Sequence, residues 1–376
     1  MDNKIWKKTE KTKSVQEEFM ALAVQQAEKG MGFTSPNPMV GAVIVKNGKV
    51  ISADFHHKYG EFHAERNAIL NCTEDMHGAQ LYVTLEPCCH FGKTPPCTQI
   101  IIESGISEVF VGSADPNPLV AGKGCEQLRN VGITVHEGIL KEECDRLNRI
   151  FFHYITHDTP YVIYKYAMTA DGKTSSHTGA SQWISGEGSR RDVQGYRLLC
   201  SGIMVGINTV LADDPRLTCR LEKGRDPVRV ICDSNLKIPL DSYIVKTSGE
   251  VPTVIACCKN ASPEKAALLK KAGAEVFFTE SEKQVELSGL MGFLHSEKHM
   301  DSLLLEGGSQ LAFSMLEAGL VNEVVGYIAP KLLGGKNANS PVGGAGFEIG
   351  DSEIKLSAPR ITQIGDDIKL EWEVSG

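Results

Sequence analysis

The spacing of apolar residues along the first 140 positions predicts helices and strands in alternation. Ser14 to Glu17 has the pattern of a capping box, and apolar residues at helical spacing follow as far as Gly30. Residues 39–45 have the pattern of a buried strand, and Asn47-Gly48 predicts a type I′ hairpin turn into a partner strand over 50–55, because both turn residues must tolerate positive φ. Further along we expect helices over 64–71, 97–104 and 125–130 and strands over 81–85, 109–112 and 133–137. Such alternation is typical of an α/β fold, a sheet covered by helices.

A second series of elements begins after a polar segment over 156–160. Pro160 disfavours helix at the residue before it, so we expect a domain boundary here, with one domain over 14–158 and another over 160–376. In the second domain we expect strands over 161–166, 203–205, 228–232, 251–257, 275–278 and 302–305 and helices over 188–200, 263–272 and 310–318. Two short strand patterns, over 354–356 and 368–372, predict an antiparallel edge. The second domain is therefore also expected to be α/β.

The composition is that of a folded globular protein. The 376 residues are enough for two domains, 41% of them are hydrophobic, and no apolar run approaches the roughly 18 residues that a membrane-spanning helix needs. A net charge of −8 argues against bulk binding of nucleic acid, although local cations can still hold a small anionic ligand. We therefore exclude a membrane protein and expect no nucleic-acid partner.

The cysteines indicate a reducing compartment. Eleven is an odd number, adjacent pairs recur at 88–89 and 257–258, and residues 1–13 lack the apolar segment of a signal peptide. We expect a cytoplasmic protein with free thiols.

Three residues in the first domain have the types and positions of zinc ligands. His63 precedes a predicted helix, Cys88 follows a predicted strand, and Cys97 lies beyond a loop rich in Gly and Pro. Three protein ligands leave a fourth position for water, whose pKa falls towards about 7 on the metal. Glu65, two residues after the histidine, is placed to carry protons, as in zinc deaminases with the H-x-E and P-C-x-x-C patterns, although the cysteine spacing here is wider.

Other interpretations of these residues remain open. Cys89 or His90 can replace Cys88 as a ligand, and four protein ligands make a closed structural site. Taken singly, each candidate also fits a structural role, such as a buried thiol or a carboxylate at a helix start. Their joint occurrence at strand ends and helix starts favours the catalytic interpretation.

Several strings in this half resemble the deaminase half of the bifunctional riboflavin-biosynthesis deaminase/reductases. They are PNPMVG from Pro36, HAE from His63, TLEPC from Thr84, the wide Cys88 to Cys97 gap with KTPP inside it, and DPNP from Asp115. The resemblance implies a cytidine-deaminase-like fold that removes the 2-amino group of a diaminopyrimidinone carrying a phosphoribosylamino group. It implies that His63, Cys88 and Cys97 bind zinc, that Glu65 is the proton shuttle, and that Asn37, His56 and Lys93 lie by the substrate.

The second half offers weaker signals from its residues alone. A strand over 303–305 runs through Glu306, Gly307 and Gly308 into a helix, and amides at such a helix start can hold a phosphate, although a lone Gly-Gly is more often a tight turn. A second cluster, around 171–220, mixes Trp, Arg and carboxylates on predicted loops, where binding residues usually lie. Arginine suits a phosphate because its planar fork donates two hydrogen bonds at once.

This half resembles the reductase half of the same family, so the similarity covers residues 14–375. The strings that carry it are YAMTADGK from Tyr166, SQWI from Ser181, TVLADDPRLT from Thr209, DS from Asp233 and EGG from Glu306. The resemblance implies a dihydrofolate-reductase-like fold that uses NADPH to reduce the ribosyl chain to ribityl. It places at NADPH the residues Ala167, Trp183, Thr209, Asp213, Ser234, Gly308, Ser309, Gln310 and Leu311. It places at the substrate the residues Lys165, Ser181, Arg197, Leu217, Arg220 and Glu306. Gly195 weakens the helix that carries Arg197 by about 1 kcal/mol relative to Ala, which puts the aim of that arginine in doubt.

The sequence thus predicts a two-site enzyme with one zinc ion and NADPH, acting on a small phosphorylated pyrimidine. We also expect a homo-oligomer. One alternative keeps the zinc chemistry but directs it at a tRNA or nucleotide base, with the second half as a recognition module; the acidic composition argues against it. Another makes the zinc structural and the second half an inactive ligand-binding module.

Overall fold

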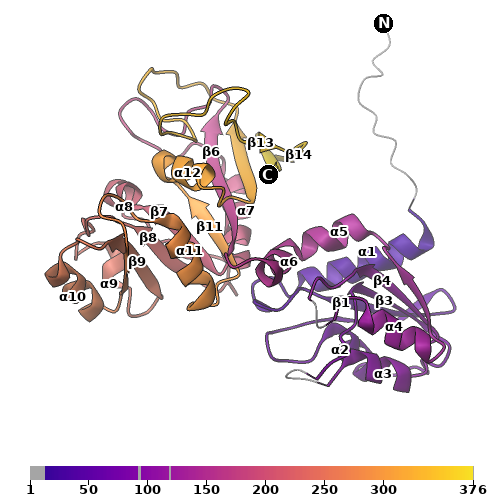
Figure 1. Ribbon diagram of the computed structural model, residues 1–376. Helices are drawn as coiled ribbons and strands as arrows, with labels where there is room; N and C mark the ends of the chain where they lie inside the picture. Colours follow the sequence, from indigo (N-terminus) through magenta and orange to yellow (C-terminus); the bar gives the residue numbers. More distant parts are fainter. Residues whose placement is uncertain (1–12, 92–94, 118–119, 376) are drawn as a thin grey trace, which may run out of the picture. The chain divides into compact units, whose positions relative to one another are not determined.

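The computed structural model describes residues 13–91, 95–117 and 120–375, and the chain divides between Thr156 and His157 into two compact units (Figure 1). Each unit has its own sheet and its own hydrophobic clusters. Within the described residues no helix is both long and apolar enough to cross a membrane; the longest, α1 (Val15–Glu28), has 14 residues.

The start of the chain confirms the local sequence signals. Ser14 is the N-cap of α1, where its hydroxyl accepts from the amide of Glu17 and its own amide donates to the Glu17 carboxylate at 2.7 Å. The hairpin of β1 (Gly41–Lys46) and β2 (Lys49–Phe55) turns at Asn47 and Gly48, whose φ angles are 54° and 74°. Both values lie in the region that a type I′ turn requires.

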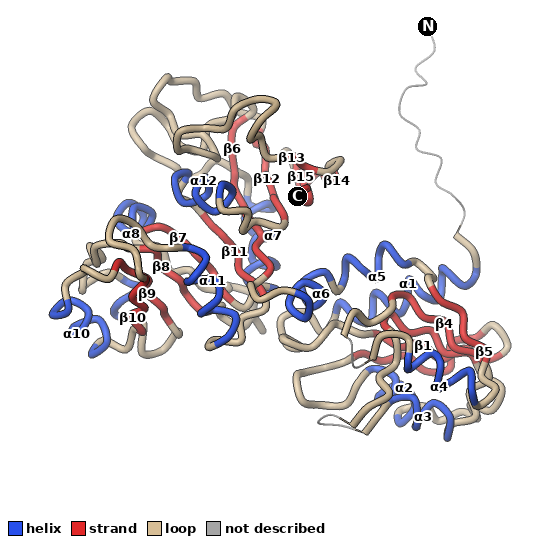
Figure 2. Tube along the Cα trace, in the orientation of Figure 1, coloured by secondary structure: helices blue, strands red, loops and turns tan. Residues whose placement is uncertain are grey.

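The first unit is a five-stranded sheet in the order β2-β1-β3-β4-β5, in which β1 pairs antiparallel with β2 and β3, whereas β3, β4 and β5 are parallel. Its remaining elements are α2 (Ala64–Leu70), β3 (Gln80–Leu85), α3 (Cys97–Glu103), β4 (Glu108–Ser113), α4 (Lys123–Asn130), β5 (Thr134–Glu137), α5 (Lys141–Leu147) and α6 (Arg149–Thr156). Figure 2 shows helices on both faces of the sheet.

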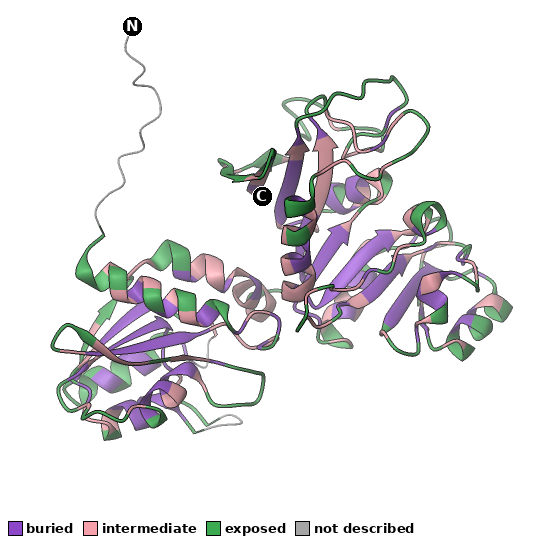
Figure 3. Cartoon of the chain, turned by 180° about the vertical axis from the view of Figure 1, so that it is seen from behind, coloured by how far each residue is buried: buried purple, intermediate pink, exposed green. Residues whose placement is uncertain are grey.

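The period-2 alternation of β1 explains this three-layer arrangement. Ala42 and Ile44 pack in the cluster formed with α2, α3 and α4, whereas Val43 and Val45 pack in the cluster formed with α1 and α5. All four side chains are fully buried. In Figure 3 the colour of buried residues follows the strands of the sheet. A strand covered on both faces needs consecutive apolar residues, which residues 42–45 provide.

The second unit is a ten-stranded sheet in the order β10-β9-β8-β7-β11-β6-β12-β15-β13, with β14 also paired to β15. Strands β6 to β12 are parallel, and β15 is antiparallel to β12, β13 and β14. The strands are β6 (Tyr161–Thr169), β7 (Gly202–Gly206), β8 (Val228–Cys232), β9 (Thr253–Cys258), β10 (Glu275–Thr279), β11 (Ser302–Glu306), β12 (Glu323–Ala329), β13 (Lys355–Leu356), β14 (Arg360–Ile364) and β15 (Asp367–Ser375). The helices are α7 (Glu187–Leu199), α8 (Ile207–Asp213), α9 (Tyr243–Lys246), α10 (Pro263–Lys271), α11 (Leu287–Ser296) and α12 (Ser309–Glu317).

The strand order of this sheet points to one edge as a binding site. The strands β7 to β10 lie on one side of β6 and β12 on the other, and β11 is inserted between β6 and β7. Ligands of open parallel sheets bind beyond the carboxyl ends of the strands, where the order changes direction. The carboxyl ends of β6, β7, β8 and β11 therefore form the candidate site of this unit.

The sequence missed several elements. They are α5, α6, α8, α9, α11, β12 and β14. The correction that affects the site concerns α8, because Thr209 and Asp213 lie on this helix and not on a loop.

Candidate active sites

Three donor atoms converge in the first unit. His63 is the N-cap of α2, Cys88 follows β3, and Cys97 is the first residue of α3. The Nδ1 atom of His63 lies 3.5 Å from the Sγ atoms of both cysteines, and all three donor atoms lie within 4.8 Å of one another. In the part of the chain that the structure describes, no other group of His, Cys, Asp or Glu converges in this way, so Cys89 and His90 are not part of the cluster.

These separations fit a tetrahedral zinc ion. Zinc lies about 2.3 Å from sulfur and 2.0–2.1 Å from nitrogen, so two such ligands at a tetrahedral angle lie about 3.6 Å apart. The hydrogen bond with Cys97, followed by that with His63, lowers the pKa of the Cys88 thiol to about 4. The thiolate is the form that binds a metal. The residues present can therefore hold zinc with three ligands.

Glu65 lies beside this cluster on α2, and its side chain is 3% exposed. Its Oε2 atom has no hydrogen-bond partner among the described residues, which is costly for a buried carboxylate and points to a group that completes the site. Burial raises the pKa of Glu65, against the opposing effect of His63. A carboxyl group so placed can accept and return a proton.

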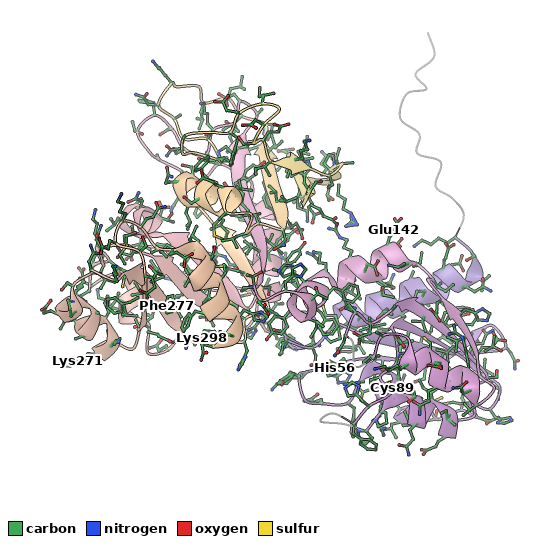
Figure 4. The ribbon with its side chains drawn as sticks, viewed as in Figure 1. His56, Cys89, Glu142, Lys271, Phe277 and Lys298 are labelled. Atoms are coloured by element: carbon green, nitrogen blue, oxygen red, sulfur yellow. The ribbon has the colours of Figure 1, made fainter. Side chains whose placement is uncertain are left out.

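Asn37 and His56 form a polar pair next to His63. The Nδ1 atom of His56 lies 2.9 Å from the carbonyl oxygen of Phe62, and its Nε2 atom lies 3.2 Å from the side-chain nitrogen of Asn37. Burial lowers the pKa of His56, so this ring is neutral, with Nδ1 donating and Nε2 accepting. The ring meets that of His63 edge-on at 5.4 Å. Figure 4 labels His56 and Cys89 in this unit. Lys93 lies outside the described residues.

Sequence reasoning missed the structural role of Glu86. Its buried carboxylate accepts hydrogen bonds from the amides of Gly122, Gly124 and Cys125, at 2.9–3.1 Å, and so caps the start of α4. The amide of Asp115 also points to it, at 3.4 Å. Glu86 thus holds the loop beyond β4 against the segment that carries Cys88. Its position inside the string TLEPC was the available signal.

In the second unit most of the candidate residues lie at the carboxyl ends of the parallel strands. Lys165 and Ala167 belong to β6, Thr209 and Asp213 to the helix after β7, Ser234 follows β8, and Glu306 to Leu311 lead from β11 into α12. Gly307 and Gly308 have φ angles of 87° and 81°, and a Cβ on Gly307 would lie 3.4 Å from Thr209 Oγ1. The glycines therefore bring the start of α12 close to α8.

Glu306 joins two of the predicted substrate residues. Its carboxylate accepts from Arg197 Nε at 3.0 Å and Nη2 at 2.8 Å, and Lys165 Nζ lies 3.7 Å away. Arg197 Nη1 donates to the carbonyl of Thr218. Burial opposes ionisation of Glu306, but Lys165 and Arg197 outweigh it and lower its pKa to about 2. Helix α7 runs through Gly195 without a break, and this bidentate pair fixes the guanidinium of Arg197.

Trp183 is held on the surface by residues that the sequence did not single out. It is 60% exposed, and the guanidinium of Arg190 lies 4.7 Å from its ring centre. Lys331 Nζ donates to the carbonyls of Trp183 and Ile184, at 3.1 and 2.8 Å. An exposed aromatic ring fixed by a cation is suited to stacking on a planar ligand.

The remaining candidates differ in their exposure. Ser181 is half-buried and Arg220 is exposed, whereas Leu217 is buried with a φ of 51°. The hydroxyl of Ser234 accepts from the amide of Val285 at 3.2 Å.

Two family models match the two units separately. Residues 13–113 match the cytidine and deoxycytidylate deaminase zinc-binding region, and residues 160–370 match the RibD C-terminal domain. The second match alone covers more than half of the chain.

Curated relatives match over nearly the whole length. The chain is 52% identical to riboflavin biosynthesis protein RibD of Actinobacillus pleuropneumoniae and 43% identical to that of Bacillus amyloliquefaciens, with 95% of each chain covered in both cases.

Solved structures agree. A diaminohydroxyphosphoribosylaminopyrimidine deaminase/5-amino-6-(5-phosphoribosylamino)uracil reductase from Thermotoga maritima has a TM-score of 0.83 at 37% identity, and RibD of Acinetobacter baumannii has a TM-score of 0.82 at 33%. Each comparison covers 96% of this chain and 99% of the other.

Proposed function

The chain belongs to the RibD family, the bifunctional deaminase and reductase of riboflavin biosynthesis, and we propose that its two units divide the two reactions between named residues. The cofactors are zinc in the first unit and NADPH in the second. Because both halves match one bifunctional family, nothing favours a base deaminase acting on tRNA or an inactive second half.

In the first unit, His63, Cys88 and Cys97 hold the zinc ion. When bound, zinc lowers the pKa of water towards about 7 and so supplies a nucleophile at neutral pH. Glu65 takes up a proton and delivers it to the leaving ammonia, since its buried Oε2 atom has no other partner among the described residues. The substrate is the diaminopyrimidinone that carries a phosphoribosylamino group.

Asn37 and His56 orient the pyrimidine in this proposal. The neutral His56 ring, fixed by Phe62, accepts from the Asn37 side-chain amide and so orients it, which leaves the Asn37 oxygen and its second N–H for the pyrimidine. Lys93 is proposed as a contact to the phosphoribosyl group.

In the second unit, NADPH supplies the hydride that reduces the ribosyl chain to ribityl. We propose that Trp183 packs against the cofactor, that Gly308, Ser309, Gln310 and Leu311 offer amides at the start of α12 to a phosphate, and that Ala167, Thr209, Asp213 and Ser234 complete the site. The proposal is supported by the convergence of most of these residues at one edge of the sheet.

The substrate of this unit lies beside Glu306 in this proposal. Three of the five N–H groups of Arg197 are used by Glu306 and Thr218, which leaves two for a substrate oxygen. Lys165 and Arg220 add positive charge next to the same carboxylate. Ser181 and Leu217 are proposed as flanking contacts.

The convergence of His63, Cys88 and Cys97 beside a buried Glu65 is the observation that carries the proposal. A two-stage assay tests it: purified protein receives the diaminopyrimidinone substrate, ammonia is followed, and NADPH is then added while its absorbance is followed. We expect ammonia first and NADPH oxidation afterwards. Ammonia without NADPH oxidation would overturn the assignments in the second unit.

Glu65→Gln should retain zinc but release ammonia at least about 100-fold more slowly, because an amide cannot move the proton. Zinc content is measured by atomic absorption alongside ammonia release. Full activity in a zinc-loaded variant would remove Glu65 from the proton path.

Arg197→Ala should raise the reductase KM for the phosphorylated substrate by about tenfold or more and leave ammonia release unchanged, because a charged hydrogen bond is lost at one site only. An unchanged KM would exclude Arg197 from the substrate site. Arg191→Ala, a nearby substitution on α7, serves as the control.

We infer a homo-oligomer and a cytoplasmic location. Exposed apolar side chains on the second unit, Leu332, Ile349 and Ile361, support self-association, and eleven cysteines without a disulfide support a reducing compartment. Light scattering during size-exclusion chromatography measures the mass of the assembly in solution. A mass equal to that of one chain would contradict the homo-oligomer.

A further inference from the structure

One face of β15 carries three charged residues that contact helix α7. Asp367, Lys369 and Glu371 alternate along the strand, so their side chains point to the same side. Asp367 and Glu371 are buried, and the side chain of Lys369 is 12% exposed. Burying a row of charges is costly unless each finds a partner, and α7 supplies the partners.

The first contact lies at the start of α7. Asp367 Oδ2 accepts from the amide of Gly186, the N-cap residue, at 2.7 Å and from the hydroxyl of Ser189 at 2.6 Å. Gly186 has no side chain with which to cap its own helix. The carboxylate of Asp367 thus serves as the cap, in the position where a negative charge is favoured by the helix dipole.

The second and third contacts follow at helical spacing. Lys369 Nζ lies 3.1 Å from Asp192 Oδ2, which also accepts from the hydroxyl of Tyr327 at 2.6 Å. Glu371 Oε1 accepts from the hydroxyl of Tyr196 at 2.7 Å. The residues 189, 192 and 196 lie on one face of a helix, as 367, 369 and 371 do on one face of a strand. We call these three contacts the β15–α7 ladder.

A polar ladder fixes the position of a helix more strictly than an apolar face does. Sliding α7 by one residue along β15 would separate the buried carboxylates of Asp367 and Glu371 from the donors on α7, which is unfavourable. Apolar side chains have no such directional requirement.

The next residue on α7 is Arg197, which points elsewhere. Tyr196 donates to Glu371 on β15, while Arg197 donates to Glu306 on β11 and to the carbonyl of Thr218. One side of α7 is therefore fixed by the ladder, and a different side carries Arg197 towards Glu306 in the reductase site.

We propose that the β15–α7 ladder is a positioning device of the reductase site, in which Tyr196 and Glu371 set the placement of Arg197. This inference rests on the proposed contact of Arg197 with the substrate. Neither Tyr196 nor Glu371 touches the substrate; both act through the helix.

Tyr196→Phe tests the ladder by removing one hydroxyl. We expect the reductase KM to rise about three- to tenfold and kcat to stay within about twofold of the parent. A change of this size in KM matches the interaction free energies usually found between coupled residues. Ammonia release should not change. Tyr164→Phe is the matched control: it removes a buried tyrosine hydroxyl that donates to the carbonyl of Pro341, at 2.5 Å, and this bond includes no residue of α7 or β15.

A double-mutant cycle separates positioning from a general structural role. In an Arg197→Ala background, Tyr196→Phe should cause no further rise in KM, because the residue through which it acts is absent. Equal rises in both backgrounds, or an equal rise in Tyr164→Phe, would overturn the proposed role of the ladder. If Arg197→Ala itself leaves KM unchanged, the proposed substrate contact fails, and the ladder fails with it.

Glu371→Gln provides a second variant should Tyr196→Phe not fold. The glutamine oxygen still accepts from the Tyr196 hydroxyl, so KM should stay within about twofold of the parent, whereas Glu371→Ala should raise it as Tyr196→Phe does. A similar rise in Glu371→Gln and Glu371→Ala would contradict the assigned hydrogen bond as the positioning contact.

Discussion

The buried carboxyl group of Glu306 stays ionised because Lys165 and Arg197 lie next to it. Lys165 and Arg197 lower its pKa to about 2 although burial opposes this. A carboxylate whose pKa falls on folding stabilises the folded state above its unfolded pKa, and this contribution disappears as the pH falls through the folded pKa. The relevant range therefore extends from about pH 4.5 down to about pH 2.

Glu306→Gln should lower the free energy of unfolding of the second unit by about 3 kcal/mol at pH 7, because a shift of this size corresponds to that energy. The difference from the parent should be constant above about pH 5 and shrink steadily as the pH falls from there towards about pH 2. Urea unfolding followed by Trp fluorescence measures it, since Trp183 and Trp372 both lie in the second unit. A difference that is unchanged at pH 3 would contradict the assigned pKa.

The residue types at the sites were predictable, but their partners were not. His63, Cys88 and Cys97 have the chemistry of zinc ligands wherever they occur, and the structure brings them together. The pair of Arg197 and Glu306 joins residues 109 positions apart, and only the strand order places them side by side. Local periodicity carries no information about such a contact.

At the scale of elements, helix α4 depends on a carboxylate from another part of the chain. Its N-cap, Gly122, has no side chain, and Glu86 accepts from the amides there instead. A helix start without such a partner leaves buried donors unsatisfied.

Glu86→Ala should destabilise the first unit by about 2–4 kcal/mol, because several buried amides lose their acceptor. Hydrogen exchange at Gly122 to Cys125 should accelerate, while peptides of the second unit exchange as before. The control is Glu126→Ala, which removes an exposed carboxylate from the first turn of the same helix. Unchanged protection in Glu86→Ala would show that other groups cap α4.

Several elements that the sequence did not predict contain residues that disfavour a helix or a strand. Helix α8 contains Asp213 next to Asp214-Pro215, a combination that favours a turn, and α11 contains two glycines. Strand β12 has Gly326 at its centre, where a Cβ would lie 2.8 Å from the ring of Tyr166. Gly326 allows the ring of Tyr166 to lie close to β12. Strand propensity alone counts a central glycine as evidence against a strand, so the sequence did not predict β12.

At the scale of the whole molecule, the two reactions depend on separate units, each with its own core. A chelator should abolish ammonia release but leave NADPH oxidation intact when the deaminated substrate is supplied, because the converging metal ligands of the described residues all lie in the first unit. Zinc should restore ammonia release. Loss of NADPH oxidation on chelation would mean that the reductase also depends on the metal.

Strand β15 also has a consequence for the synthesis of the protein. The bond from Gly186 to Asp367 spans 181 residues, and the ribosome adds about 5–20 residues each second, so α7 waits for about 10–35 s before its cap emerges. The first unit ends at Thr156, so contacts within it, such as that between Met39 and Asn148 across 109 positions, can form before the second unit is complete. The nascent chain therefore contains the whole deaminase unit while its reductase unit still lacks β15, the strand that joins β13 and β14 to β12.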